Sequence, residues 1–203
     1  MPAEQTPEWY KFSDPRPEWL RGKYGMLSDR DIRRCLEEGI IKIEPFDLTK
    51  LDEIIKNPCK VDFHLGNVLT TYVKGRIMGI KLREPIPREL QDDIDIRDGE
   101  THVLHPGDHF LARTKEKLTL PTYMSARLEG KSSVARKGIK VEAAAVFDPG
   151  WDGVPTLELK HEGPVPTEVT PGDEICAFTF MLLTTPALKP YQGKYQNQSA
   201  PMP

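Results

Sequence analysis

Short apolar and alternating runs fill the chain from Val61 onward and predict strands rather than long helices. The runs are Val61–Leu65, Val68–Val73, Ile77–Leu82, Val103–Leu104, Phe110–Ala112, Lys140–Phe147, Thr156–Leu159 and Ile175–Leu183. Sequences that favour turns separate them, namely His105-Pro106-Gly107-Asp108, Asp148-Pro149-Gly150 and Pro171-Gly172-Asp173. Many short strands joined by Pro/Gly turns are typical of a β-sandwich or a β-barrel.

Two short helices are predicted before the strands. The first follows Ser28, which together with Asp31 resembles a capping box, and it ends at Gly39. The second runs from about Asp47 to Lys56, and Pro58 prevents it from continuing. We interpret both helices as scaffold.

The same pattern divides the chain into three parts. Residues 1–24 form an N-terminal arm, either flexible or packed against a neighbouring subunit through Trp9, Tyr10, Phe12 and Trp19. Residues 25–185 form one domain, in which the polar stretch 83–100 is a long excursion. Residues 186–203 have no apolar period and are interpreted as a tail, either a mobile end or a lid on an active site.

Composition narrows the functional classes. Of 203 residues, 38% are hydrophobic and 29% are charged, which is ordinary for a soluble globular protein. A net charge of −3 argues against nucleic acid or an anionic membrane as the main partner. Neither a signal-peptide pattern nor a membrane-spanning stretch is present, so we expect a cytoplasmic protein. Cys35, Cys59 and Cys176 are expected to be reduced thiols.

The distribution of charge is more informative than its sum. From Arg113 to Lys140 there are eight Lys/Arg and two Glu, a balance of +6. From Val141 to Ile175 there are one Lys and eight Asp/Glu, a balance of −7. These blocks suit a site that binds phosphates at one end and activates water at the other. Two solvated faces of opposite sign account for them at least as well.

The segment Gly130-Lys131-Ser132-Ser133-Val134-Ala135-Arg136 carries the first chemical signal. A glycine, two hydroxyls and flanking cations offer a polyphosphate backbone N–H groups, O–H donors and positive charge at one turn. The segment is not a P-loop, because the second glycine of that motif is missing at the required spacing. Two further segments follow it, Val146-Phe147-Asp148-Pro149-Gly150-Trp151-Asp152-Gly153 and Thr156-Leu157-Glu158-Leu159.

Together these segments resemble the dCTP deaminase family of the dCTP deaminase and dUTP diphosphatase superfamily. That family carries an SSxAR or SSxGR turn, an Asp-Pro-Gly-aromatic-x-Gly strand end and a Leu-Glu strand. The other matching segments are Met26–Ile32, Pro58 with Val61–Gly66, Leu104–Asp108, Ala112–Glu116, Leu120-Pro121, Pro171-Gly172 and Tyr191–Gln198. The resemblance extends over about residues 26–198 and leaves out the arm and the stretch 83–100.

The resemblance implies a mostly-β, distorted β-barrel of the dUTPase-like type with short N-terminal helices outside it. It also implies a homotrimer whose active sites lie between subunits. The expected ligands are dCTP and dUTP, with dTTP as a further nucleotide. Mg²⁺ is expected to be bound through the triphosphate rather than by a protein cage.

The resemblance also assigns roles. Glu158 would be the general acid/base of deamination, with Ser132 and Arg136 in its network. One carboxylate can serve both the attack of water at C4 and the departure of ammonia. Asp148 would activate or orient water in a diphosphatase reaction. Nucleotide contacts are expected from Lys131, Ser132, Ser133, Arg136, Ala144, Asp148, Glu158 and, in the tail, Tyr191, Lys194 and Gln198.

Taken singly, these residues also have plainer explanations. Ser132 and Ser133 fit turn caps, and Asp148 fits a turn initiator. Glu158 fits an outward-facing strand residue, Arg136 a structural ion-pair partner, and Lys194 and Gln198 an unattached tail.

A zinc mechanism is not expected. The zinc deaminase signature, H-x-E followed by P-C-x-x-C, is absent. His102, His105 and His109 have a spacing that suits a metal, but we expect them only to flank the turn that enters a strand. We therefore predict no protein metal site.

Two features depart from the deaminase pattern. Ser132 to Asp148 spans seventeen residues, the length in diphosphatases and one fewer than in deaminases, and His161 stands where Asn is common. Glu158 and Arg136 are deaminase-type residues. The sequence thus favours dCTP deamination first, and dUTP diphosphatase or both activities second. A non-enzymatic nucleotide-binding regulator is third, because Glu158 and Asp148 are both present.

Overall fold

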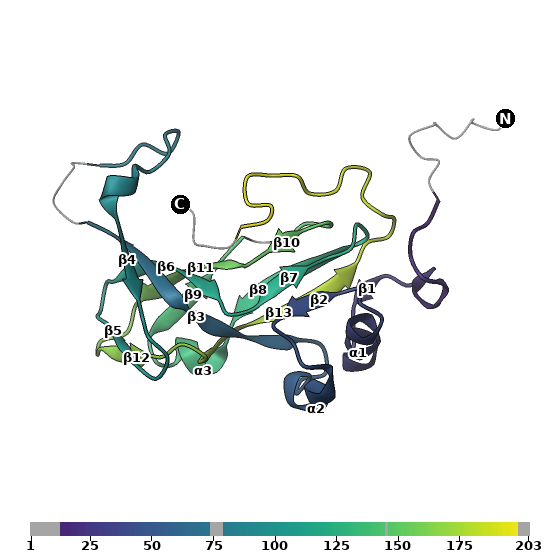
Figure 1. Cartoon of the computed structure of the whole chain (residues 1–203), viewed down its shortest axis with the longest axis horizontal. Coiled ribbons are helices and arrows are strands. Elements are labelled where there is room, and N and C mark those ends of the chain that lie inside the picture. Colours follow the sequence, from purple (N-terminus) through teal and green to yellow (C-terminus); the bar gives the residue numbers. More distant parts are fainter. Residues whose placement is uncertain (1–12, 74–78, 145, 199–203) are drawn as a thin grey trace.

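One curled sheet forms the body of the protein (Figure 1), in a computed structural model that describes residues 13–73, 79–144 and 146–198. Six of its strands follow the order β1-β13-β3-β6-β11-β9, with β4 added on β3 and β8 on β13, and all pairs are antiparallel. The strands are β1 (Gly25–Met26), β13 (Glu174–Leu182), β3 (Val61–Tyr72), β6 (His109–Thr114), β11 (Thr156–His161), β9 (Ile139–Glu142), β4 (Gln91–Asp95) and β8 (Met124–Gly130).

Two smaller sheets and a few short helices complete the fold. The smaller sheets are β10 (Asp152–Gly153), β7 (Lys117–Thr119) and β2 (Lys42–Glu44), and the pair β12 (Thr167–Val169) and β5 (His102–Leu104). The helices are α1 (Asp29–Glu37), α2 (Leu51–Ile54) and α3 (Ser132–Ala135), with 3-10 turns at Glu18–Leu20, Leu48–Lys50 and Arg88–Leu90. This architecture confirms the predicted distorted β-barrel with short N-terminal helices.

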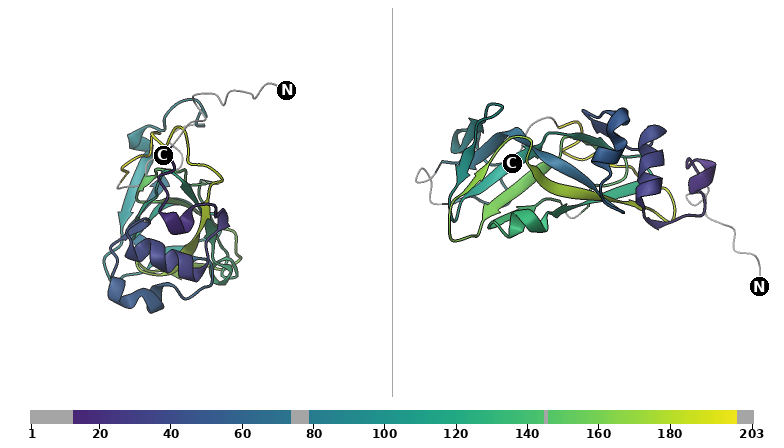
Figure 2. Two further views of the ribbon diagram at one scale, coloured as in Figure 1. Left: turned by 90° about the vertical axis from the view of Figure 1, so that its right-hand side faces the viewer. Right: turned by 90° about the horizontal axis from the view of Figure 1, so that it is seen from below.

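The first two helices and the excursion lie at opposite ends of the elongated sheet (Figures 1 and 2). Ser28 caps α1 as predicted, its hydroxyl accepting a hydrogen bond from the backbone N–H of Asp31 at 3.4 Å. The second helix is shorter than predicted: it begins with the 3-10 turn after Asp47, and α2 ends at Ile54. Both pack outside the barrel.

Part of the N-terminal arm packs against its own chain. Leu20 is fully buried, and the Trp19 ring lies under Arg34 and donates a hydrogen bond to Glu38 at 2.9 Å. Arg16 reaches the carbonyl of Leu183 at 3.3 Å. The arm aromatics Trp9, Tyr10 and Phe12 lie outside the described residues.

The prediction of a strand over Ile77–Leu82 is wrong for its described part, 79–82. Those residues pair with no other strand, and Leu82 is fully exposed, so their apolar pattern does not reflect a buried face. The run Lys140–Phe147 also ends early, because β9 stops at Glu142 and only Phe147 pairs again, in a bridge with Ala126. Conversely, the polar excursion contains β4, which pairs with β3.

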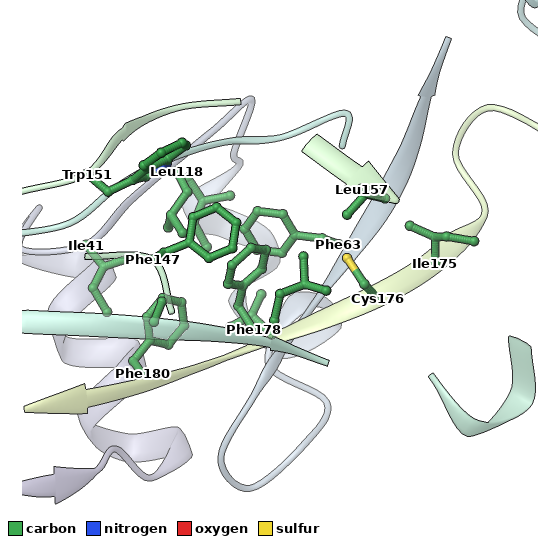
Figure 3. Close-up of a cluster of buried hydrophobic side chains, with 14 of the residues drawn as sticks. Ile41, Phe63, Leu118, Phe147, Trp151, Leu157, Ile175, Cys176, Phe178 and Phe180 are labelled. Atoms are coloured by element: carbon green, nitrogen blue, oxygen red, sulfur yellow. The ribbon is translucent and has the colours of Figure 1, made fainter. Parts of the chain in front are cut away.

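Three phenylalanines hold the centre of the core together (Figure 3). The ring centroid of Phe178 lies 4.5 Å from that of Phe63 and 5.0 Å from that of Phe147. Phe147 in turn meets Trp151 edge-on at 5.0 Å. These contacts connect β3 and β13 to the turn that carries Asp148.

Phe178→Ala should therefore lower the free energy of unfolding by about 3–5 kcal/mol. The substitution leaves a cavity between Phe63 and Phe147, which are held by other strands and cannot move to fill it. Chemical denaturation measures the change. Val165→Ala, at a side chain that is 62% exposed, is the control and should change stability by less than about 0.5 kcal/mol. Equal losses in the two variants would contradict the central position of Phe178.

Candidate active site

A cavity of about 550 Å³ opens where the sheet, the Asp148 turn and the tail meet. Its floor is the outer face of β11 and β6, and its sides come from the Asp148 turn, the end of β3, the excursion and the tail. Of the residues expected at a nucleotide site, it brings together Ala144, Asp148, Glu158, Tyr191 and Gln198.

Strand alternation aims Glu158 at this cavity. Leu157 and Leu159 are buried on the core side of β11, so the residue between them must point away from the core. Glu158 lies opposite Leu111 of β6 and opposite Glu142 of β9. The carboxylate is therefore carried by the middle strand of three, on a backbone held from both sides.

The same alternation explains His161. It points to the core side of β11, is 2% exposed, and lies 3.1 Å from the hydroxyl of Thr167. The backbone N–H of Gly163 donates to its other ring nitrogen at 3.2 Å. His161 therefore stabilises the turn after β11 and does not face the cavity.

Asp148 lies at the head of a tight turn on the cavity wall. The backbone N–H of Trp151 donates to its carbonyl at 3.0 Å, and Gly150 has a φ of +85°, which favours glycine. A Cβ atom at Gly150 would lie 2.9 Å from the Cβ of Pro190 in the tail. The turn is thus shaped both by its own bend and by the tail that crosses it.

The tail lies across the cavity as far as Gln198. The backbone N–H groups of Tyr191 and Asn197 donate to the carbonyls of Pro149 and Asp152 at 2.8 and 2.7 Å. The Tyr191 ring packs on Trp151 with a centroid distance of 5.4 Å. The tail therefore forms one side of the site in this structure.

Gln198 anchors the end of the described tail. Its side chain is 7% exposed, and its amide nitrogen donates to the carbonyl of Val154 at 2.7 Å and to the hydroxyl of Thr156 at 3.2 Å. Its side-chain oxygen is buried without a partner among the described residues. A phosphate contact for Gln198 stays a prediction, whereas its contact with the start of β11 is observed.

The turn expected to bind phosphates lies elsewhere. Ser132, Ser133 and Arg136 are exposed on and just after α3, at the lower edge of the molecule in Figure 1, whereas the tail runs along the upper edge. Lys194 is exposed in the tail, and its ammonium lies 5.2 Å from the Tyr195 ring centroid. Within one chain, the α3 turn and the Glu158 cavity do not meet.

Lys131 is held by two carboxylates. Its ammonium lies 2.8 Å from Asp62 of β3 and 2.5 Å from Glu174 of β13, and its side chain is 14% exposed. The hydrogen bonds from Lys131 and then Lys56 lower the pKa of Glu174 to about 2. Lys131 thus fixes the start of the α3 turn to the sheet.

Sequence reasoning missed the wall formed by Tyr72, Ile86, His109 and Leu111, and the cavity contact of Trp151. The Tyr72 and His109 rings are nearly parallel, 16° apart, with centroids separated by 6.1 Å. Burial, and then the charge of Glu158, raise the pKa of Tyr72. Part of this wall could have been inferred from the sequence. Leu111 lies two residues from His109, so both side chains must share one face of β6.

The described residues contain no cluster of three His, Cys, Asp or Glu side chains arranged to hold a metal ion. His102 meets Phe110 edge-on at 5.5 Å, while His109 lies against Tyr72. No helix in the described part of the chain is long and apolar enough to cross a membrane.

Comparison with solved structures finds a similar barrel fold. This chain is similar to the crystal structure of 2'-deoxycytidine 5'-triphosphate deaminase from Agrobacterium tumefaciens, with a TM-score of 0.58 and 23% identity. That similarity covers 78% of this chain and 48% of the other, so the match spans about half the length of that structure. At this level of identity it shows the fold alone.

The chain belongs to the dCTP deaminase-like family, whose model matches residues 26–183. It is 40% identical to the dCTP deaminase of Thermomicrobium roseum over 185 residues, covering 88% of this chain and 92% of that protein. It is 38% identical to a Corynebacterium glutamicum protein named "dCTP deaminase, dUMP-forming", covering 88% and 94% of the two chains. The resemblance seen in the sequence motifs is confirmed.

Lys131→Met should lower the free energy of unfolding at neutral pH by about 3 kcal/mol, because it leaves Asp62 and Glu174 without their shared cation. The native pKa of Glu174 lies near 2, below its usual value of 4.5. Its contribution to stability is therefore complete above about pH 4.5 and is lost as pH falls towards 2. The deficit of the variant should shrink over that window, measured by denaturation at a series of pH values.

Lys56→Met is the matched control, since Lys56 pairs with the same Glu174 at 2.8 Å but is 54% exposed. Its loss should be no more than about 1 kcal/mol. The loss of unfolding free energy in Lys131→Met could prove equally small, or could grow as the pH falls. Either result would contradict the proposal that Lys131 fixes the α3 turn to the sheet.

Proposed function

We propose that this protein is an enzyme that hydrolytically deaminates dCTP to dUTP. The observation that carries the proposal is the position of Glu158 on the floor of the cavity, in the Leu-Glu strand of a chain that belongs to the dCTP deaminase-like family. The names of the relatives support the same substrate.

The geometry suits a single carboxylate that moves protons. Water attacks C4 of the cytosine ring, Glu158 takes one of its protons, and the proton passes to N3 to give a tetrahedral intermediate. Glu158 then transfers a proton from the new hydroxyl to the amino group, which leaves as ammonia. Because β11 is hydrogen-bonded on both sides, the backbone that carries the carboxylate is fixed before substrate binds.

The assembly we propose is a homotrimer in which the α3 turn of one subunit meets the Glu158 cavity of the next. The separation of these two regions within one chain supports it, since Ser132, Ser133 and Arg136 are exposed and none of them lines the cavity. A neighbouring subunit would bring hydroxyls and a guanidinium to the triphosphate. Lys194 of the tail would add positive charge there, and Lys131, whose ammonium is paired with Asp62 and Glu174, would hold the turn in place.

A second candidate is a dUTP diphosphatase activity, alone or following deamination. Asp148 on the cavity wall is available to orient water towards the α-phosphate, and the run from Ser132 to Asp148 has the shorter length. Several similar proteins are named as dUMP-forming. A purely regulatory nucleotide-binding role ranks third, because both carboxylates are present at the cavity.

We further propose that Mg²⁺ enters with the triphosphate and that deamination needs no zinc. The cavity carries the carboxylates of Asp148 and Glu158 and the amide of Gln198, which suit proton transfer and nucleotide contact. dTTP, which shares the sugar and triphosphate of the substrate but carries a methyl group at C5, is proposed as a competing ligand that binds more weakly than dCTP. A reducing cytoplasm suits the chain, since Cys35, Cys59 and Cys176 are free and burial raises the pKa of Cys35 to about 12.

Glu158→Gln should lower kcat for dCTP deamination by about 10²–10⁴, because it keeps the shape of the side chain but removes the proton acceptor. Nucleotide affinity should change little. Chromatography that separates dCTP, dUTP, dUMP and pyrophosphate measures both products, with Mg²⁺ and a zinc-selective chelator present. Asp148→Asn is the companion variant and should abolish pyrophosphate release from dUTP where the wild type shows it.

Wild-type rates in Glu158→Gln would refute the assignment of this residue. A wild-type protein that ignores dCTP and cleaves dUTP would establish the second candidate instead. Loss of deamination with the chelator, restored by zinc, would refute the metal-free mechanism.

Mixed trimers test the shared site. Ser132→Ala and Glu158→Gln should each be inactive alone, and their co-expression in equal amounts should recover about a quarter of wild-type activity, since half of the chains on each side of an interface are intact. Mass spectrometry of the intact trimers is the control for subunit mixing, since the two variant chains differ in mass and mixed species can be told from the two homotrimers. No recovery in this mixture would show that each site is built within one chain.

A further inference from the structure

The proposed mechanism gives no role to the wall of the cavity that faces away from Asp148. Tyr72 at the end of β3, Leu111 and His109 of β6 and Ile86 of the excursion form this wall beside Glu158, with the His109 ring packed against that of Tyr72. Leu111 lies directly opposite Glu158 across the β11–β6 pair. The wall therefore lies next to the carboxylate that we propose as the acid/base.

Ile86 is the residue through which the part of the excursion before β4 reaches the cavity. Between residues 79 and 89 every side chain is exposed except Ile86, which is partly buried and lines the cavity. The Gln91 amide donates to the carbonyl of Ile86 at 3.2 Å, and Gln91 pairs with Tyr72 across β4 and β3. These contacts hold Ile86 above the end of the cavity floor.

Tyr72 is fixed just as firmly. His109 lies against its ring from β6, and burial together with the charge of Glu158 raises the pKa of the phenol. The ring is thus close enough to Glu158 to sense its charge, and it lies on the same side of the carboxylate as Ile86 and Leu111.

The chemistry of the base decides which edge can face this wall. C4 of cytosine has two ring neighbours, N3 and C5. The N3–O2 edge carries hydrogen-bond acceptors, and burying it against carbon would cost free energy without a compensating bond. The C5–C6 edge carries only C–H groups. Ile86 and Leu111 present only carbon, and Tyr72 adds the face or edge of a ring.

We propose that Ile86, with Leu111 and Tyr72, packs against the C5–C6 edge of the pyrimidine and limits the size of the group at C5. The proposal rests on the proposed deamination of dCTP and extends it to the choice between cytosine and 5-substituted cytosines. The excursion is then a specificity element rather than a connection between strands.

The test compares dCTP with 5-methyl-dCTP in Ile86→Ala and in Leu82→Ala. Leu82 lies directly before the excursion and is fully exposed, so it is the matched control. The ratio of kcat/KM for 5-methyl-dCTP over dCTP should rise roughly tenfold in Ile86→Ala, because removing methylenes from an apolar pocket makes room for one methyl group. It should stay at the wild-type value in Leu82→Ala. Ile86→Val, which removes one methylene, should give a smaller rise.

Binding measurements separate the proposed deamination from the proposed role of Ile86. The affinity for 5-methyl-dCTP relative to dCTP is measured for each variant in the Glu158→Gln background, in which no deamination is expected. Deamination of dCTP with an unchanged ratio in Ile86→Ala and Ile86→Val would overturn the specificity role and leave the proposed function standing. A wild-type protein that does not deaminate dCTP, but whose binding ratio shifts in Ile86→Ala, would overturn the function and leave the wall in its role. An equal shift in Leu82→Ala would also overturn the role of Ile86.

Discussion

The two-residue alternation of β11 is the constraint on which the site depends. Leu157, Leu159 and His161 fill the core side, which leaves Glu158 no direction except the cavity. Because β6 and β9 pair with β11 on either side, a slip of one residue would bury the carboxylate and expose two leucines. The register that buries the two leucines is therefore the same register that points the carboxylate into the cavity. The free energy of folding thus also maintains the position of Glu158.

The same coupling appears at the neighbouring turn. Phe147 is held among the rings of Phe178 and Trp151, and the next residue is Asp148. The aromatic core thus sets the position of the turn from below, and the tail covers it from above through Pro190 and Tyr191. A substitution at Phe178 would shift Phe147, and Phe147 is joined directly to Asp148 on the cavity wall. Stability and the geometry of the site are therefore not independent in this protein.

The sequence predicted what depends on local pattern. The many short strands and the cap at Ser28 follow from periodicity and short motifs, and the resemblance to the family singled out Glu158 in its Leu-Glu strand. It could not predict which distant segments complete the cavity. Ile86 reaches it only because Gln91 pairs with Tyr72, and the apolar run at 79–82 was misleading because its residues pack against nothing. The position of α3 was equally hidden, since no motif states on which edge of a sheet a turn will lie.

The attachment of the tail has a consequence for how this protein can diverge. Tyr191 and Asn197 are held through backbone N–H groups that donate to the carbonyls of Pro149 and Asp152, and the carbonyl of Gln198 accepts from the backbone N–H of Val154. Main-chain bonds form whatever side chain a residue carries. Apart from Tyr191, Gly193 and Gln198, whose side chains or lack of one also shape the tail, substitutions along it can therefore accumulate without changing its path over the cavity. The surface that the tail presents to the cavity can then change by mutation while the scaffold beneath it stays the same.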